Sequence, residues 1–440
     1  MNSRITRVVV LGGGFGGVYA ALELERRLGS DPNIEITLVH RDNFFLFTPM
    51  LHEVAASDLD PVHIVNPLRK LLRKTRLFHG EVHKIDLDAR ALVVSHGVDD
   101  GHEHEIEYDH LVLGLGSITH TYGLPGVSER ALTMKTLGDA FALRNRVVES
   151  LEEADFECCP RVRERMTTLV VAGGGFAGVE TLAAIHDFAE EARPYYSGLR
   201  DVRLRMVLVH SGDRLLPELS DELGEYARQL LEERGVEVRL RTKVASLTDA
   251  GVQLSSGECI PARTLVWTAG TAPNPLLASL DVPKERGRIV VDEYLRAASK
   301  PGVWALGDCA HAPDGRGGTC PPTAQHASRQ GKILARNLEA ALRGRPMRPF
   351  RFRTLGQLAS LGRRAGVAEI LGLRFSGFAA WWLWRTVYLA KLPRFERKLR
   401  VALDWTLDLL FSKDLVHMPT APGTRAAAPR AAASTKTAAA

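Results

Sequence analysis

The sequence predicts an α/β fold in which two similar units are followed by a helical C-terminal segment. Three observations lead to it. The chain has 440 residues, which is too long for one ordinary core. The stretch "RVVVLGGGFGG" at 7–17 returns as "TLVVAGGGFAG" at 168–178, and each copy is followed by helix-forming sequence and a second apolar run. A strand–helix–strand pattern written twice predicts two parallel sheets with covering helices.

The glycines of the two copies fit a G-x-G-x-x-G turn. In such a turn the first glycine allows a tight bend, the second lets the backbone approach a pyrophosphate, and the third lets the helix pack on the strand. The helix N-terminus then offers free N–H groups to the phosphates. The two sets are Gly12, Gly14 and Gly17, and Gly173, Gly175 and Gly178. One such turn is weak evidence, but two in matching context predict two Rossmann-like dinucleotide-binding domains.

Three further segments have the form of an apolar strand followed by a small-residue turn. "YDHLVLGLGS" at 108–117 contains Gly116, and "ARTLVWTAGTAPNPL" at 262–276 contains Gly270. We expect these two to be the return strands of the two units. The third, "PGVWALGDCAH" at 301–311, places Asp308 after a strand, where an aspartate usually caps a turn or helix.

Composition and charge exclude several classes of protein. The net charge of +5 is mild for this length, so nothing indicates nucleic-acid binding. Five scattered cysteines with no C-x-x-C pair fit a reducing compartment and give no zinc-site spacing, so no metal is expected. The N-terminus enters a strand at once, which leaves no room for a signal peptide. No run reaches 18 uncharged apolar residues, so no membrane-spanning helix is expected.

With these pieces in this order, the chain resembles the type II NADH:quinone oxidoreductases, the non-proton-pumping NADH dehydrogenases of the two-dinucleotide-binding flavoprotein superfamily. The likeness covers residues 5 to about 418. Its most specific pieces are the paired glycine motifs, "FLFTPMLHEVAA" at 45–56, "GDCA" at 307–310 and "PPTAQHASRQG" at 321–331.

The resemblance implies FAD in the first unit and NADH, with NADPH possible, in the second. Glu180 is expected near the nicotinamide and flavin, and Asp308 at the flavin ribityl chain. The expected cofactor-binding residues are Gly12, Gly14, Phe15, Gly17, His40, Arg41, Gly116, Asp308, Gly173, Gly175, Gly178, His210, Gly270 and Ala324.

A quinone is the electron acceptor that the resemblance implies. Phe47, Pro49, Met50 and Leu51 are expected to line its site beside the flavin. Ala324, Gln325, Ala327 and Gln330 match the family's A-Q-x-A-x-x-Q pattern, and the two glutamines could donate hydrogen bonds to the quinone oxygens. Read without the pattern, such glutamines are more often helix-surface or interhelix hydrogen-bonding groups.

Related flavoproteins provide the alternatives. Disulfide reductases need a redox cysteine pair beside the flavin, and residues 35–56 contain no cysteine. Sulfide:quinone oxidoreductases use cysteines, and Cys158, Cys159 and Cys320 keep that alternative open, although the second glycine motif favours a nicotinamide site. A ferredoxin-type reductase and a low-turnover redox sensor also remain.

The C-terminal segment has a different character. Residues 376–413 hold four of the six tryptophans, Trp381, Trp382, Trp384 and Trp405. From Phe395, apolar residues recur at helical spacing with charges on other faces, as in an interfacial helix. We expect these residues to bind a membrane surface as a peripheral anchor, on the cytoplasmic side of the cell inner membrane. The alternative is that the tryptophans pack on the nucleotide domains or form a homodimer interface.

Both strand ends depart from the usual flavoprotein pattern, since His40 and His210 stand where an acid commonly holds the adenosine ribose. Loss of a carboxylate removes the repulsion that excludes a 2′-phosphate, so NADPH is possible, with Arg214 as its partner. NADH is favoured because no dedicated arginine cluster follows the strand.

The domain boundaries follow from these assignments. We expect the FAD-binding domain at 1–164 and 291–345, and the NAD(P)H-binding domain at 165–290. The membrane-association segment is expected at 346–420. The alanine-rich stretch 421–440 is expected to be a disordered tail.

Overall fold

The computed structural model describes residues 4–96 and 102–418. The expected tail at 421–440 lies outside these residues. The first unit is built on a five-stranded sheet of order β22-β9-β1-β2-β5, in which every neighbouring pair is parallel. Its strands are β1 (Thr6–Leu11), β2 (Ile34–His40), β5 (Arg76–His79), β9 (His110–Leu113) and β22 (Val303–Ala305). The segment at 108–117 is therefore a return strand of the first sheet, as expected, and the strand within 301–311 pairs with it at the sheet edge.

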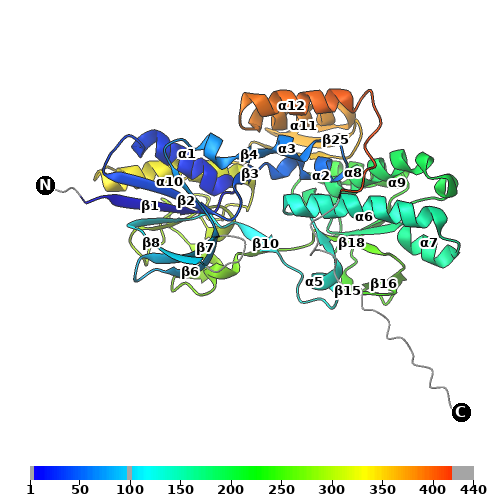
Figure 1. The fold of residues 1–440 in the computed structure, drawn as a ribbon, viewed down its shortest axis with the longest axis horizontal. Coiled ribbons are helices and arrows are strands. Elements are labelled where there is room, and N and C mark those ends of the chain that lie inside the picture. Colours follow the sequence, from blue (N-terminus) through cyan, green and yellow to red (C-terminus); the bar gives the residue numbers. More distant parts are fainter. Residues whose placement is uncertain (1–3, 97–101, 419–440) are drawn as a thin grey trace, which may run out of the picture.

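Two helices lie side by side on one face of this sheet (Figure 1). They are α1 (Phe15–Leu28) and α10 (Ala324–Leu342). They approach closely because Gly331 has no side chain: a Cβ there would lie 2.6 Å from the carbonyl oxygen of Gly16. An antiparallel sheet covers the other face, made of β6 (Glu81–Asp86), β7 (Ala91–His96) and β8 (His102–Glu107). The shorter elements of this unit are β3 (Phe44–Leu46), η1 (Thr48–Met50), α2 (Leu51–Ala55), α3 (Pro61–Ile64), β4 (Val65–Pro67), α4 (Leu68–Leu71), β20 (Lys284–Glu285), β21 (Arg288–Val290), η5 (Gly307–Cys309) and β23 (Ala310–His311).

The second unit repeats the plan with a parallel sheet of order β11-β18-β12-β13-β14. Its strands are β11 (Leu132–Thr133), β12 (Thr168–Ala172), β13 (Arg205–Val209), β14 (Glu237–Arg239) and β18 (Thr264–Trp267). The chain already enters this sheet at β11, which lies before residue 165, the expected start of the NAD(P)H-binding domain. The surrounding elements are α5 (Val127–Arg130), α6 (Leu137–Phe156), α7 (Pro160–Met166), α8 (Phe176–Ala192), η2 (Arg193–Tyr195), η3 (Ser197–Leu199), α9 (Asp221–Glu233), β15 (Val244–Thr248), β16 (Gly251–Leu254), β17 (Cys259–Ile260) and η4 (Pro275–Leu277).

Two antiparallel strands, β10 (Ser117–Thr119) and β19 (Thr271–Pro273), connect the units. Each strand directly follows one of the predicted small-residue turns, at Gly116 and Gly270. The connection therefore places Gly116 and Gly270 near the junction between the units.

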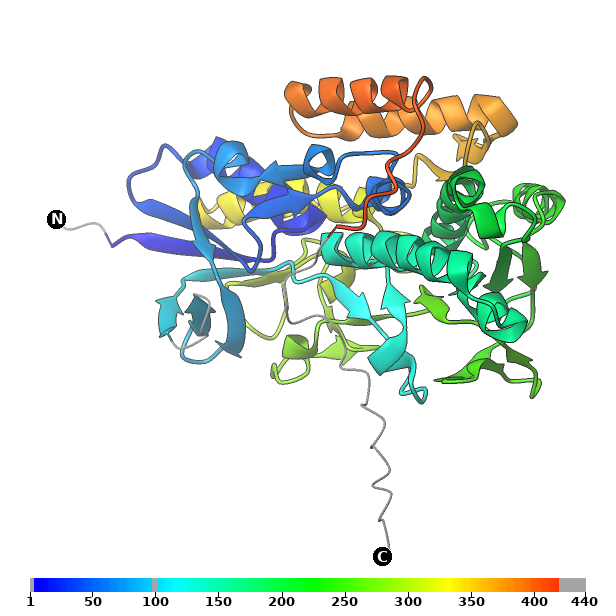
Figure 2. The same cartoon turned by 45° about the vertical axis from the view of Figure 1, so that its right-hand side comes forward.

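The C-terminal segment contains a small sheet that the sequence analysis did not predict. It is antiparallel and consists of β24 (Gly356–Ser360), β25 (Gly366–Ile370) and β26 (Leu373–Ser376). The helices α11 (Gly377–Lys391) and α12 (Phe395–Leu407) follow it and lie along the top of the molecule (Figure 2). Within residues 4–96 and 102–418, no helix is long and apolar enough to cross a membrane.

The tryptophans of this segment are placed differently from the expectation of a membrane face. Trp381, Trp384 and Trp405 are buried, and only Trp382 is exposed, at 55%. The expectation that these residues face a membrane surface is therefore wrong for three of the four tryptophans. These indoles pack inward, which was the alternative interpretation.

After α12 the chain crosses the second unit as an extended strap, residues 408–418, which α6 holds (Figure 2). The Arg144 guanidinium donates to the carbonyl oxygens of Asp414 and Val416. The Asn145 amide exchanges two hydrogen bonds with the backbone of Met418. The strap therefore ties the C-terminal segment to the second unit.

Candidate active site

The two glycine turns have matching geometry at the start of α1 and α8. Gly12 and Gly173 have φ values of 99° and 122°, a region that side chains rarely adopt. A Cβ on Gly17 or Gly178 would lie 1.8 Å from the carbonyl oxygen of the first glycine of its set. Only glycine fits at these positions.

A cleft with an empty volume of about 1490 Å³ extends from the first glycine turn. The space beside Gly14 is free, because a Cβ there would meet no atom within 4 Å. Gly14 is also the N-cap of α1 and provides no side-chain cap, so the N–H groups of the first turn are free to bind phosphate. This cradle fits the pyrophosphate of FAD. The predicted residues that line the cleft are Gly12, Gly14, Phe15, His40, Arg41 and Gly116.

Asp308 lies behind this cleft in a network of hydrogen bonds. Asp308 Oδ2 accepts a hydrogen bond from the Ser117 hydroxyl at 2.6 Å. The Ser117 Oγ in turn accepts a hydrogen bond from the Lys135 ammonium at 2.8 Å. The backbone N–H of Gly307 donates to Gln330 Oε1 at 2.7 Å. Gln330 is 1% exposed and is not among the residues that line either cleft. Its geometry therefore supports the Asp308 turn rather than the expected donation to a quinone.

His40 packs against Gly13 and His210 packs against Gly174, the residues that follow the first glycine of each motif. A Cβ on Gly13 would lie 2.2 Å from His40 Cδ2, and one on Gly174 would lie 2.7 Å from His210 Cγ. His210 Nδ1 accepts a hydrogen bond from the Gly174 N–H at 3.1 Å, so in the neutral ring the proton is on Nε2. Burial lowers the pKa of both imidazoles, to about 4 for His40. Both rings are therefore neutral.

A second cleft, with an empty volume of about 1380 Å³, lies where the two units and the C-terminal segment meet. Thr48 and Lys135 line both clefts, so the two lie next to each other. The second unit contributes Phe176, Glu180 and Gly270 to its lining, among others. The first unit contributes Pro49, Leu51 and Gln325, and α11 contributes Tyr388.

Glu180 on α8 is the acidic residue that lines the second cleft. Its Oε1 accepts hydrogen bonds from the Ser360 N–H and from the Trp384 indole, both at 3.0 Å. Its Oε2 lies 3.9 Å from His52 Nδ1. Burial raises the pKa of Glu180 to about 8, and the nearby Glu53 carboxyl raises it further; the two hydrogen bonds favour the anion, but they lower the pKa by less than burial raises it. The carboxyl group is therefore protonated at neutral pH.

The remaining predicted residues of the quinone site divide into two groups. Pro49 and Leu51 line the second cleft, whereas Phe47 and Met50 are buried and outside its lining. Gln325 lines it, but its Nε2 donates to the Gly356 carbonyl at 2.7 Å, and its Oε1 is buried without a partner. The free atom of Gln325 is thus an acceptor, not the expected donor. Ala324 begins α10 beside the cleft.

The cysteines lie elsewhere. Cys158 and Cys159 are exposed between α6 and α7, and Cys320 is buried, with its thiol 3.5 Å from the Pro313 carbonyl. None of the five, all within the described residues, lines either cleft. The geometry gives no support to a cysteine-based reaction at this site.

His52 and Trp384 were not singled out from the sequence. His52 and its neighbour Glu53 are polar residues inside the apolar stretch Leu51–Ala56, and both are 5% exposed. Two ionisable residues within an otherwise apolar stretch were the available signal. The indole donor on α11 had no sequence signal, because its partner is about 200 residues away.

Two nucleotide-type units with adjoining clefts define a class of two-dinucleotide-binding flavoprotein. Residues 6–331 match the family model described as pyridine nucleotide-disulphide oxidoreductase, and residues 355–414 match the NDH2 C-terminal domain. The chain belongs to this family and, within it, to the type II NADH:quinone oxidoreductases, whose cofactors are FAD and NADH.

Individual relatives agree over nearly the whole length. The chain is 33% identical to demethylphylloquinone reductase NdbB of Synechocystis sp., over 92% of this chain and 96% of the relative. It is 32% identical to the type II NADH:quinone oxidoreductase Ndh of Mycobacterium tuberculosis, over 92% and 89%. The fold is that of NDH2 from Plasmodium falciparum, solved in complex with NADH, with a TM-score of 0.86 at 18% identity over 94% of this chain and 100% of that one.

Proposed function

We propose that this enzyme passes electrons from NADH through FAD to a quinone at the junction of the two clefts. The observation that carries the proposal is that the two clefts adjoin at Thr48 and Lys135, and that the first cleft also contains the phosphate cradle at Gly12 and Gly14. FAD, when bound, takes up a hydride and returns two electrons to an acceptor. The residues of the chain bind and orient the two nucleotides and the quinone, and they supply a proton to the quinone.

The first cleft holds FAD in this proposal. The glycine turn at 12–17 binds the pyrophosphate, and His40 and Arg41 face the adenosine end. Asp308 acts through Ser117, which lines the cleft and is hydrogen-bonded to it. The negative charge of Asp308 is balanced by Lys135 through the same hydroxyl group.

The second glycine turn, at 173–178, binds NADH, with the nicotinamide directed toward Gly270. The geometry of His210 bears on the choice of nucleotide. With Nδ1 occupied by Gly174, the ring offers a neutral N–H donor to a ribose hydroxyl. Arg214 is already paired with Asp221 and the Pro217 carbonyl, so it is not a free phosphate partner. We therefore keep NADH as the preferred donor; a higher kcat/KM for NADPH would contradict this choice.

Glu180 is the group we assign to proton donation. A protonated carboxyl that lines a cleft can donate to a quinone oxygen as negative charge develops there, which is general acid catalysis. Pro49, Leu51 and Tyr388 provide walls for an apolar head group. The unpaired oxygen of Gln325 can accept a hydrogen bond from the quinol.

The exposed face of the C-terminal segment is the proposed membrane contact. Side chains with at least half of their surface exposed lie on α11, α12 and the turn after them: Phe378, Trp382, Phe395, Leu399, Leu403, Leu407, Leu410 and Phe411. An exposed apolar row of this size on helices too short to span is typical of an interfacial anchor. We place the enzyme as a peripheral protein on the cytoplasmic side of the cell inner membrane.

Anaerobic stopped-flow measurements test the proposed function directly. The FAD-loaded enzyme is mixed with NADH, and then with a water-soluble quinone analogue. We expect rapid bleaching of the flavin absorbance followed by its full return. Bleaching without return would favour the redox sensor instead, and no bleaching would contradict the proposal.

A further inference from the structure

The two glycine turns differ in what lies opposite the second glycine of each motif. A Cβ on Gly14 would meet no atom within 4 Å, whereas a Cβ on Gly175 would lie 4.0 Å from the carboxylate oxygen Oε1 of Glu218. Gly14 and Gly175 are the equivalent N-cap positions of α1 and α8, where the phosphates of a dinucleotide are expected. The first turn is therefore open, and the second turn faces an acid.

Glu218 also lies close to His210. Burial lowers the pKa of His210, and the Glu218 carboxylate is the charge that opposes this most strongly. His210 stands at the strand end where an acid commonly binds the adenosine ribose. Glu218 thus returns an acid to this part of the site from the loop that follows the strand.

The backbone of this loop, residues 211–220, is fixed against the second glycine turn. The Leu216 N–H donates to the Gly174 carbonyl at 2.8 Å. Leu216 and Leu219 are buried, although Leu216 has a left-handed φ of 48°. A leucine keeps such a strained conformation only where the surrounding packing requires it. The exposed side chain of Glu218 therefore extends from a backbone that its buried neighbours hold in place.

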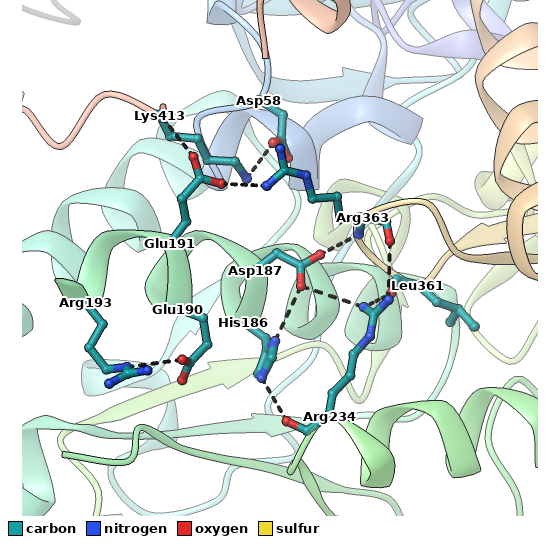
Figure 3. Close-up of polar contacts among 10 residues, drawn as sticks. All are labelled: Asp58, His186, Asp187, Glu190, Glu191, Arg193, Arg234, Leu361, Arg363 and Lys413. Atoms are coloured by element: carbon teal, nitrogen blue, oxygen red, sulfur yellow. Dashed lines mark hydrogen bonds and ion pairs between the residues drawn. The ribbon is translucent and has the colours of Figure 1, made fainter. Parts of the chain in front are cut away.

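Helix α9, which follows the loop, is anchored at both ends. At its start, the Ser220 N–H donates to Glu369 of β25 at 3.2 Å. At its end, the Arg234 guanidinium donates to the Leu361 carbonyl at 2.6 Å and lies 3.7 Å from Asp187 Oδ1 of α8. Figure 3 shows this guanidinium between Asp187 and Leu361. The loop that carries the acid is therefore fixed at its far end as well.

The negative charge of Glu218 has no direct partner. Within residues 4–96 and 102–418, Glu218 makes no hydrogen bond and no ion pair. Arg214, on the same loop, is paired with Asp221. Arg241 is an exposed cation next to the loop, since its backbone N–H donates to the Gly212 carbonyl at 2.8 Å. A bound nucleotide would therefore meet an unneutralised carboxylate beside the second glycine turn.

We propose that Glu218 makes the enzyme select NADH against NADPH, in place of the acid that is missing at His210. The proposal rests on the proposed function and names the residue that sets its nucleotide preference. The adenosine ribose of NADH has free hydroxyl groups, one of which can donate to the Glu218 carboxylate. The neutral His210 ring, with its proton on Nε2, can donate to a second ribose oxygen. In NADPH the 2′-hydroxyl carries a phosphate, which the carboxylate repels.

The test is Glu218→Gln in the full-length, FAD-loaded enzyme, because glutamine keeps an oxygen acceptor but removes the charge. Calorimetric titration measures the Kd values of NAD⁺ and NADP⁺, and anaerobic stopped flow measures flavin bleaching by NADH and NADPH. We expect the preference for NADH to fall by about 10-fold or more, through tighter binding of the phosphorylated nucleotide. The Kd of NAD⁺ should stay within about threefold of wild type. Added salt should weaken the preference of the wild type more than that of the variant.

Two further variants of the same loop are the controls. Glu218→Asp keeps the charge and should retain most of the preference for NADH. Asp213→Asn removes another exposed acid that acts on His210 but does not approach Gly175, and should change the preference by less than about twofold. Because both side chains are exposed, the variants should fold as the wild type does.

A wild-type ratio of the two Kd values in Glu218→Gln would overturn the assignment. An equal change in Asp213→Asn, or a wild-type preference for NADPH, would overturn it as well. These binding measurements involve no quinone, so they are separate from the test of the proposed function. Wild-type flavin that NADH bleaches but quinone does not reoxidise would contradict the proposed function alone.

Discussion

The inner and outer faces of α12 are made by two rows of residues at the same spacing. Arg397, Val401 and Trp405 are buried, whereas Leu399, Leu403 and Leu407 are more than half exposed. Each row repeats every four residues, and the rows differ by two residues, which is about 200° around a helix. The inner row carries the indole that holds Glu53, and the outer row has no partner within the described residues. One helix therefore serves both the polar interior and an external surface.

The same division holds for α11. Trp384 is fully buried and donates to Glu180, while Trp382, two residues earlier, is 55% exposed. The inner and outer faces should therefore fail separately when they are mutated. Loss of an inner residue should disturb stability and proton chemistry, and loss of an outer residue should disturb membrane attachment alone.

The largest expected effect is on the inner face. Trp384→Ala leaves a cavity and removes a hydrogen bond from Glu180, so we expect the free energy of unfolding to fall by about 3–5 kcal/mol. Trp382→Ala is the matched control and should change it by less than about 0.5 kcal/mol. Chemical denaturation of the FAD-loaded protein measures both. Equal losses would mean that the two faces do not differ as described.

A smaller effect is expected from the outer face. Leu403→Glu replaces an exposed apolar side chain, and burial of one leucine in a membrane surface stabilises binding by roughly 1.5–3 kcal/mol. We expect cosedimentation with anionic phospholipid vesicles to weaken by about 10-fold or more. The free energy of unfolding and turnover of a soluble quinone analogue should stay at wild-type values. Unchanged vesicle binding would argue against an anchor at this face.

A third effect is expected in the dependence of stability on pH. The pKa values of Glu53 and Glu180 rise from 4.5 to about 8 on folding. Between these values the folded state holds protons that the unfolded state has released, so stability is highest at low pH in this window and falls as pH rises. Glu180→Gln should reduce that slope by up to about 1.4 kcal/mol per pH unit. Denaturation midpoints at several pH values between 5 and 8 check this, and an unchanged slope would mean that Glu180 is ionised in the folded protein.

Much of the nucleotide-binding part followed from the sequence because its determinants are local. Gly12 and Gly173 are next to the strands and helices that they connect, and the physical demand on each is visible in the motif itself. The outer row of α12 could be read from helical periodicity for the same reason. Local spacing is sufficient where a residue acts on its own element.

The inner face could not be read in this way. The partners of Trp384 and Trp405 are Glu180 and Glu53, which lie 204 and 352 residues away in the chain. The role of Gln330 likewise depends on a turn that packs against its helix. A tryptophan-rich segment has the same composition whether its rings face a membrane or a carboxyl group, so only the tertiary packing decides.

The most direct test of the central claim is the pair of half-reactions of Glu180→Gln, followed by anaerobic stopped-flow absorbance across a range of pH. The account predicts that NADH bleaches the flavin of the variant at close to the wild-type rate. Reoxidation by quinone should be slowed by about 100-fold or more, and in the wild-type enzyme it should decline above pH 8, where Glu180 loses its proton. Reoxidation of the variant at the wild-type rate throughout this range would contradict the assignment of Glu180 as the proton donor.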